Sequence, residues 1–285
     1  MTAVIDGHTH AFPPDIVSNR EQITARDEWF LQLYEDPRSR LTGEQELLAS
    51  MERSGVEHAI IAGFPWSDPG MCREHNAWMA EVCRNHPDRL SFLGIVAPFG
   101  PDAARDADDA FELGAVGIGE LNADAQGFSF EDPDDTRSVV EVCSMRGKPL
   151  MFHTSEPVGH TYPGKGTATP DKLVSWLAAY PEQPVVFAHW GGGLPFYELM
   201  PEVRAVSANA VYDCAATTYL YDFSIFGTVL DLVGPERVVF GSDFPVLGQE
   251  RLLRRVRSSV DADRIDDVLA GNARRVYGLE GVEGG

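Results

Sequence analysis

Two histidines stand two residues apart near the start of the chain, in the segment DGHTH. His8 and His10 end a short apolar run, and alternate residues of a strand project to the same face. Both imidazoles are therefore expected on one face of a first strand. Imidazole nitrogens paired in this way are typical of transition-metal sites in enzymes.

Four more groups that can bind a metal ion follow other apolar runs of the sequence. They are Glu120 in GIGELN, His153 in MFHTSE, His189 in FAHWGG and Asp243 in FGSDFP. Imidazole and carboxylate donors together suit Zn²⁺, the expected ion, with Mn²⁺, Fe²⁺ or Co²⁺ as alternatives; Ca²⁺ and Mg²⁺ prefer oxygen ligands alone. A small core set is expected to hold the ion. It comprises His8, His10, His153 and Asp243.

Glu120 and His189 have two roles open to them at this stage. Glu120 is predicted to bridge a second ion, or else to contact substrate or a metal ligand. His189 is predicted either to bind a metal ion or to carry a proton beside it, and Asp243 to act as a proton acceptor as well as a ligand. One or two ions are therefore expected.

Eight short apolar runs supply the strands that must position these side chains. Most are rich in Val, Ile and Phe, and they are continuously hydrophobic, as expected of parallel strands covered by helices. The predicted strands are Val4–Thr9, His58–Phe64, Leu90–Val96, Ala115–Leu121, Pro149–His153, Pro184–His189, Ala210–Cys214 and Val238–Ser242.

Helical patterns with recognisable ends separate the apolar runs. The segment Thr42–Gln45 has the spacing of a capping box, and Gly55 stands where that helix is expected to end. Thr169 followed by Pro170 predicts another helix start, and Gly147 another helix end. Strands and helices thus alternate along the whole chain.

Eight alternations of strand and helix predict an α/β protein, a (β/α)8 TIM barrel forming a single domain over residues 1–285. Barrel closure would bring Asp243 beside His8 and His10, with every candidate ligand at the carboxyl ends of the strands, where barrel enzymes place their sites. A doubly wound open sheet is the alternative fold, but no G-x-G-x-x-G motif follows the first strand.

The segment VGHTYPGKG after the fifth predicted strand is expected to bind substrate through His160, Tyr162 and Lys165. The alternative is a solvated loop rich in Pro and Gly, with no role in binding.

The longest stretch without a helical or strand pattern, residues 11–41, is expected to form a lid or a subunit interface. It carries Trp29 among other aromatic residues. Three aromatic residues are expected to line either the pocket or a homo-oligomer interface, and the sequence leaves these two alternatives open. They are Trp29 in this stretch and Tyr219 and Tyr221 near the seventh strand.

The charge and cysteine content exclude several classes of partner. A net charge of -21 disfavours nucleic acid and anionic membranes, because both are bound through clustered Lys and Arg. The four cysteines show no C-x-x-C spacing, which favours reduced thiols and a cytoplasmic protein. The N-terminal segment MTAVIDGHTH has no signal-peptide pattern. A small molecule is therefore the expected substrate.

The motifs DGHTH, FHTSE, AHWGG, GSDFP and GNARRVYGL together resemble the amidohydrolase superfamily, and within it the amidohydrolase-related branch of metal-dependent hydrolases and decarboxylases. The resemblance implies that His8, His10, His153 and Asp243 bind the ion, and that Asp243 also orients or deprotonates metal-bound water. His189 is similar to a histidine that assists proton transfer or binds a second ion. Glu120 is more like the bridging carboxylate of two-metal hydrolases than like the decarboxylases.

Three functions are compatible with these residues. The leading hypothesis is hydrolysis of a small carboxylate-bearing amide, lactone or ester by metal-activated water. The alternative is non-oxidative decarboxylation of an aromatic or unsaturated acid, in which His189 or Asp243 protonates carbon. The third is a catalytically silent metal-binding scaffold, and a nuclease is disfavoured by the acidic chain.

Overall fold

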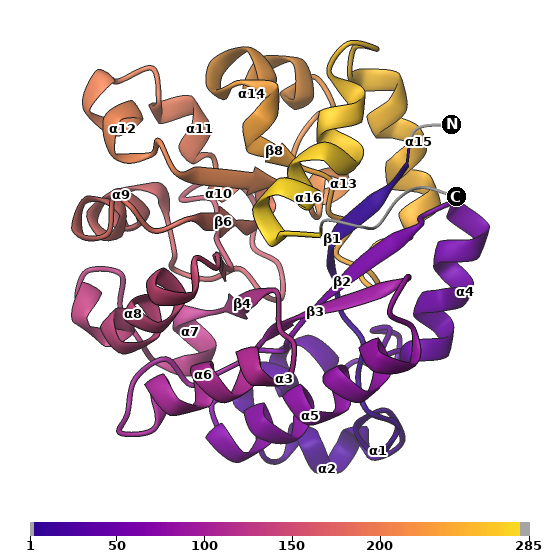
Figure 1. Ribbon diagram of the computed structural model, residues 1–285. Helices are drawn as coiled ribbons and strands as arrows, with labels where there is room; N and C mark the ends of the chain where they lie inside the picture. The colour runs from indigo at the N-terminus through magenta and orange to yellow at the C-terminus, as the bar shows by residue number, and fades with distance from the viewer. Residues whose placement is uncertain (1–2, 280–285) are drawn as a thin grey trace.

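The computed structural model describes residues 3–279 as eight parallel strands surrounded by helices (Figure 1). Each strand pairs with its neighbour in the chain, in the order β1 to β8. The strands are β1 Ile5–Thr9, β2 His58–Ala62, β3 Leu90–Gly94, β4 Gly117–Leu121, β5 Leu150–Phe152, β6 Val185–Phe187, β7 Ala210–Asp213 and β8 Val238–Val239.

Hydrogen bonds between the end of the chain and its beginning close the sheet into a barrel. The Gly7 amide donates to the Phe240 carbonyl at 2.8 Å, and the Asp243 amide donates to the His8 carbonyl at 2.9 Å. Thr9 forms a parallel bridge with Phe244. The predicted (β/α)8 TIM barrel is confirmed, and the open doubly wound sheet is wrong.

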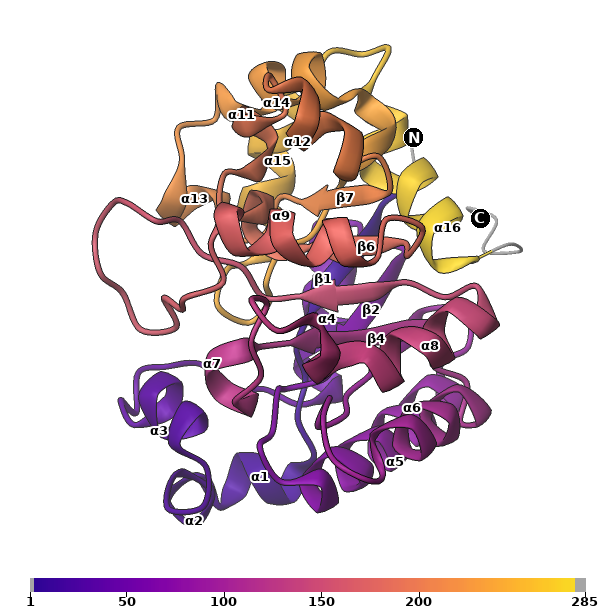
Figure 2. The same cartoon turned by 90° about the vertical axis from the view of Figure 1, so that its left-hand side faces the viewer.

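Helices cover the outside of the barrel and also form parts of its loops (Figures 1 and 2). The larger ones are α4 Glu44–Ser54, α5 Pro69–Asn85, α6 Ala103–Glu112, α8 Arg137–Arg146, α9 Pro170–Ala179, α14 Ile225–Val233 and α15 Gln249–Ser259. The shorter ones are α1 Pro14–Ser18, α2 Arg20–Thr24, α3 Glu28–Tyr34, α7 Ala123–Gln126, α10 Ala188–Gly191, α11 Leu194–Tyr197, α12 Pro201–Val206, α13 Thr217–Leu220 and α16 Asn272–Tyr277.

Buried apolar residues form a large core between the strands and the helices. A smaller buried cluster, with Ile5, Ile60, Val186 and Val239 among its members, comes from strand residues and the C-terminal helix. The continuous hydrophobicity of the predicted strands reflects this double burial. No helix among residues 3–279 combines the length and the hydrophobicity that a bilayer crossing requires.

Two local predictions at the N-terminal third were wrong. The segment expected to be irregular contains the short helices α1, α2 and α3. The predicted capping box does not form, because Gly43 occupies the N-cap of α4, and the buried Thr42 hydroxyl has no hydrogen-bond partner within residues 3–279. The predicted helix ends at Gly55 and Gly147 are confirmed, and both glycines are left-handed, with φ of 71° and 61°.

Candidate metal centre

His8 and His10 present the same ring atom to one point at the carboxyl end of β1. The Nδ1 atom of His8 lies 2.7 Å from Oδ2 of Asp213, and the Nδ1 atom of His10 lies 3.1 Å from the Ala62 carbonyl oxygen. Both partners are acceptors, so each histidine carries a proton on Nδ1. Each Nε2 is thereby left with its lone pair for a cation.

The two Nε2 atoms lie only 3.1 Å apart. Two lone pairs at this distance repel each other unless a proton or a metal ion lies between them. Ligands of a tetrahedral zinc-sized ion are separated by about 3.3 Å, given bonds of about 2.0–2.1 Å. The spacing of His8 and His10 therefore fits a pair of metal ligands.

Asp243 reaches the same point from the other end of the chain. Its Oδ1 atom lies 3.5 Å from Nε2 of His10 and 3.9 Å from Nε2 of His8. Asp243 has a φ of 62°, a left-handed conformation that is uncommon for a residue with a side chain. Such strain is tolerated mainly where surrounding contacts fix the backbone, here the hydrogen bond from the Asp243 amide to His8.

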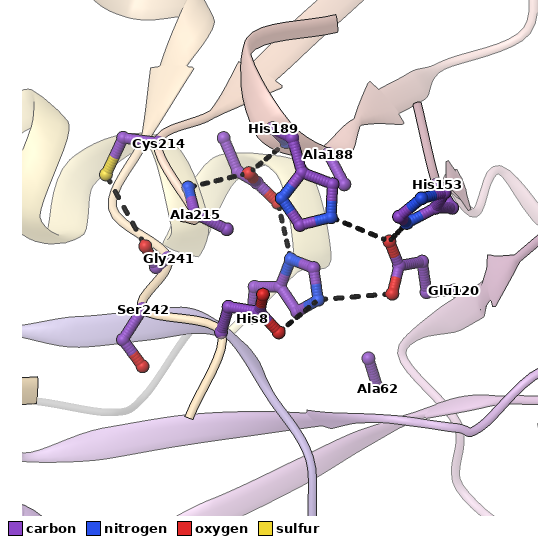
Figure 3. A network of polar contacts seen from close by, with 12 residues as sticks. His8, Ala62, Glu120, His153, Ala188, His189, Cys214, Ala215, Gly241 and Ser242 are labelled. Carbon is purple, nitrogen blue, oxygen red and sulfur yellow. Dashed lines mark hydrogen bonds and ion pairs between the residues drawn. The ribbon is translucent and has the colours of Figure 1, made fainter. Parts of the chain in front are cut away.

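Glu120, at the end of β4, joins two sets of nitrogen atoms with its two oxygens (Figure 3). Oε2 lies 3.3 Å from Nε2 of His8 and 3.5 Å from Nε2 of His10. Oε1 lies 3.0 Å from Nδ1 of His153 and 3.4 Å from Nε2 of His189. Glu120 thus has the geometry of a bridging carboxylate.

The structure divides the predicted ligands differently from the sequence analysis. His8, His10 and Asp243 form one compact set of donor atoms, whereas His153 belongs to a second set with Glu120 and His189. His153 cannot turn freely toward the first set, because its Nε2 atom lies 2.9 Å from the Gly164 carbonyl. All six predicted metal-binding residues nevertheless meet in one cluster that Glu120 joins, and all of them except the partly buried His153 are buried.

His189 stands on an unusual turn at the end of β6. Residues 189–193 all have positive φ, from 58° to 92°, so the backbone makes a left-handed turn that includes α10. The three glycines that end the turn adopt this conformation without strain, whereas His189 and Trp190 do not. The Nδ1 atom of His189 is buried and has no hydrogen-bond partner among the described residues.

The cluster concentrates buried negative charge. Glu120, Asp213 and Asp243 are all buried, and within residues 3–279 their ion pairs are to histidines, not to Lys or Arg. Burial alone would lower the pKa of His8, but Glu120 and Asp213 raise it well above its usual range. Burial likewise lowers the pKa of His189, yet Glu120 raises it to about 9.

Burial would raise the pKa of Glu120, but His8 and the other histidines hold it well below its usual range. The carboxylate is therefore ionised, and the positive charge that balances it comes either from protons on the neighbouring histidines or from a cation that replaces them. A divalent cation between His8, His10 and Asp243 would supply this charge, and the imidazole and carboxylate donors are those that transition metals prefer.

Asp213 is a functional residue that sequence reasoning missed. Oδ2 fixes the His8 ring, and Oδ1 accepts the His189 amide at 2.8 Å and the Ala215 amide at 2.9 Å. The available signal was a carboxylate at the carboxyl end of the seventh predicted strand, the same kind of position that identified the predicted ligands.

The predicted substrate loop lies beside a cavity of about 320 Å³ on the face of the barrel that carries the cluster. His160, Tyr162 and Lys165 all line it, and so does Tyr221. Figure 2 shows the loop, which runs between β5 and α9, projecting on the same side as α3 and α13. Tyr219 does not line the cavity and is 58% exposed.

Trp29, on α3, contacts the cluster itself. Its ring lies edge-on to His153, with the ring centroids 6.2 Å apart, and the side chain is buried. Of the two roles expected for residues 11–41, this contact supports a lid over the site. An oligomer interface stays a prediction.

Comparisons with known proteins agree with the fold. A family model described as amidohydrolase matches residues 5–279. The chain is 24% identical to 6-methylsalicylic acid decarboxylase of Penicillium expansum over 88% of each protein. The chain belongs to this amidohydrolase family.

Solved structures share the barrel. The 5-carboxyvanillate decarboxylase of Sphingomonas paucimobilis superposes with a TM-score of 0.79 at 19% identity, covering 97% of this chain and 99% of that one. The enzyme of the same name from Novosphingobium aromaticivorans, complexed with manganese and 4-hydroxy-3-methoxy-5-nitrobenzoic acid, has a TM-score of 0.79 at 19% identity, covering 98% of this chain and 96% of that one.

Proposed function

We propose that this protein is a metal-dependent, non-oxidative decarboxylase of a small aromatic carboxylic acid. The observation that carries the proposal is the buried cluster of His8, His10 and Asp243 with an unpaired His189 nitrogen beside it. The curated relative from Penicillium expansum is a decarboxylase of an aromatic acid, which favours this reaction over the hydrolysis predicted first.

The ion is proposed to lie between His8, His10 and Asp243. A divalent cation there would attract the substrate carboxylate and hold the ring in a fixed orientation. Zn²⁺ was expected from the donor types, and Mn²⁺, bound in the Novosphingobium relative, is an equally suitable ion for the same donors.

Decarboxylation exchanges a carboxylate for a proton at one ring carbon. The bond from that carbon to the carboxylate breaks, its electron pair stays on the ring, CO2 leaves and a proton takes its place. His189 is the proposed proton donor, because Nδ1 is free of protein partners while Nε2 faces Glu120. Asp243, 3.5 Å from His10, is the alternative donor.

Glu120 favours a second candidate function, metal-assisted hydrolysis. A carboxylate with one oxygen toward each of two donor sets is the arrangement that a two-metal site requires. The two candidates differ in metal content: we expect one ion per chain for the decarboxylase, lost in His8→Ala and retained in Glu120→Gln. Two ions, of which one is lost in Glu120→Gln, would support hydrolysis. Elemental analysis of protein purified without chelators measures both.

The reaction itself can be tested in D2O with a panel of hydroxylated, aminated and methylated benzoic acids. We expect CO2 release and one deuteron in the product at the carbon that carried the carboxylate. His189→Asn should reduce turnover by about 100-fold or more while the metal content is retained. Absence of CO2 from every acid, with hydrolysis of small esters or lactones, would contradict the proposal.

A further inference from the structure

The cavity beside the cluster has a wall of aromatic and apolar side chains and a single acidic group. Glu156 is the only acidic residue among the described residues that line it. The principal side chains of the wall are Tyr162, Phe196, Tyr197, Leu220 and Tyr221. Such a wall suits a flat ring, and a lone carboxylate in it suits a ring that carries a hydrogen-bond donor.

The two oxygens of Glu156 are not equally satisfied. Oε2 accepts a hydrogen bond from the Tyr162 hydroxyl at 3.0 Å. Oε1 is buried and has no hydrogen-bond partner of good geometry among residues 3–279. The Tyr221 side chain also faces this carboxylate, and burial together with the Glu156 charge raises the pKa of the Tyr221 hydroxyl. A buried carboxylate oxygen without a donor is costly, so this atom is suited to a donor that a ligand brings.

Lys165 is the only Lys or Arg among the described residues that line the cavity, and its contacts are with other groups. Its Nζ atom donates to the carbonyls of Val158 at 2.7 Å and His160 at 3.2 Å, and it lies over the Tyr162 ring. Two of its three N–H groups therefore form hydrogen bonds within the same loop. No ion pair to Glu156 occurs in the described part of the chain.

Glu156 lies in the loop that leaves the histidine cluster at His153. Glu156 follows His153 by three residues, so their Cα atoms are at most about 11 Å apart. Gly192 and Gly193, also in the cavity wall, follow His189 directly along the left-handed turn. The cavity is therefore lined in part by the two segments that follow His153 and His189 in the chain.

We propose that Oε1 of Glu156 accepts a hydrogen bond from a hydroxyl or amino group on the aromatic ring of the substrate, and so selects acids that carry such a donor. Tyr162 is a positioning residue that orients the carboxylate through Oε2. This inference rests on the proposed decarboxylation, because the carboxylate of the same substrate is bound at the histidine cluster.

The expected selectivity depends on whether the substrate can donate a hydrogen bond to Oε1 of Glu156. A ring hydroxyl or amino group satisfies Oε1, whereas a methoxy group in the same position offers only a lone pair and leaves the charged oxygen unpaired. We expect kcat/KM for CO2 release to be at least about tenfold higher for the donor-bearing acid than for its methoxy analogue.

The experiment compares benzoic acids that carry a hydroxyl, amino or methoxy group, or hydrogen, at each ring position in turn. The variants are Glu156→Gln and Tyr162→Phe, and the matched control is Glu182→Gln, the same change at an exposed glutamate. In Glu156→Gln the preference for the donor over methoxy should fall to about threefold or less, with unchanged preference in Glu182→Gln. Comparison of the hydroxyl-bearing acids with the amino-bearing acids shows which donor the site prefers.

Binding measurements separate failure of this inference from failure of the proposed reaction. Dissociation constants of the same acids are measured by calorimetry for the wild type and Glu156→Gln, both checked for equal thermal unfolding. If the protein releases CO2 without preferring acids that carry a hydrogen-bond donor, or if that preference persists in Glu156→Gln, the proposed role of Glu156 is wrong. Decarboxylation itself is then still supported. A donor preference in binding without CO2 release supports Glu156 and overturns the reaction.

Discussion

At the scale of single residues, the metal centre depends on groups that hold its ligands in one orientation. Asp213 fixes the His8 ring through a 2.7 Å contact to Nδ1, and the same carboxylate accepts the His189 amide. A ligand whose tautomer is fixed in this way loses little entropy when it binds an ion. We therefore expect Asp213 to affect metal affinity without touching the ion's proposed position.

Asp213→Asn tests this role. The amide can place its NH2 group toward His8, which would favour the wrong tautomer, so we expect metal affinity to fall by about 10- to 100-fold. Competition with a chelator of known affinity measures the change. Asp243→Asn serves as the comparison, because it removes the charge of a proposed ligand itself. Equal metal affinity in wild type and Asp213→Asn would show that Asp213 has no part in holding the ion.

His75 lies outside the metal centre and is expected to make stability depend on pH. Nδ1 accepts a hydrogen bond from the Trp66 indole N–H at 3.1 Å, and Nε2 donates a hydrogen bond to the Ala11 carbonyl at 3.1 Å. Burial lowers the pKa of His75 from 6.5 to about 4. Between these values the unfolded chain binds more protons, so acid favours unfolding.

The contribution of His75 is present above pH 6.5 and is lost as the pH falls toward 4. At pH 5 the loss is about 2 kcal/mol relative to pH 7. His75→Gln keeps one donor and one acceptor but does not titrate. Urea unfolding of both proteins at pH 7 and pH 5 should show the free-energy difference between them shrinking by about that amount. A difference that is the same at both pH values would contradict the assignment.

At the scale of elements, the left-handed turn of residues 189–193 connects the cluster to the cavity. Gly192 has a φ of 58°, and a side chain there would collide with the Ser155 carbonyl. Ser155 lies between His153 and Glu156, so the turn and the loop after β5 are packed backbone against backbone. A displaced turn would move His189 and that loop together.

Gly192→Ala is expected to destabilise the protein by about 2–4 kcal/mol, since both the conformation and the space are unfavourable. Turnover should fall by at least about tenfold, because misplacement of a catalytic group is costly. Gly55→Ala is the control that measures the conformational cost alone. Gly55 has a φ of 71°, but nothing lies within 4 Å of the new methyl group. We therefore expect its free energy of unfolding to fall by only about 1 kcal/mol. Thermal and urea unfolding compare the two, and equal losses would refute the predicted collision.

The strands were predictable from the sequence because burial leaves a recognisable hydrophobic pattern in them. Each of the eight predicted strands contains an observed one, because strands covered on both sides must be continuously apolar. The convergence of Asp243 with His8 and His10 was predictable as well, since a closed barrel places β8 beside β1.

Side-chain direction was not predictable in the same way. Nothing in the periodicity shows that His153 turns its Nδ1 atom toward Glu120, or that the Glu120 oxygens divide between two sets of histidines. The division depends on loop contacts such as that of His153 with the Gly164 carbonyl. The run of three glycines after Trp190 was a signal for an unusual turn, but its left-handed geometry is set by packing against Ser155.

At the scale of the whole molecule, the chain carries far more negative than positive charge. It has 44 acidic and 23 Lys or Arg residues, for a net charge of -21. The ion pairs at the surface, such as Arg146 with Asp108 and Glu112, neutralise only part of this excess. Self-repulsion of a compact acidic molecule opposes folding and is screened by salt.

We therefore expect the Tm at pH 7.5 to rise by several degrees when NaCl is increased from about 10 mM to about 500 mM, because the Debye length falls from about 30 Å to below 8 Å. The matched control is the same titration near pH 5, close to the sequence pI of 4.6, where the net charge is small and the rise should largely vanish. An equal rise at both pH values would indicate a general salting effect on apolar burial, and would show that charge repulsion does not limit the stability of the barrel.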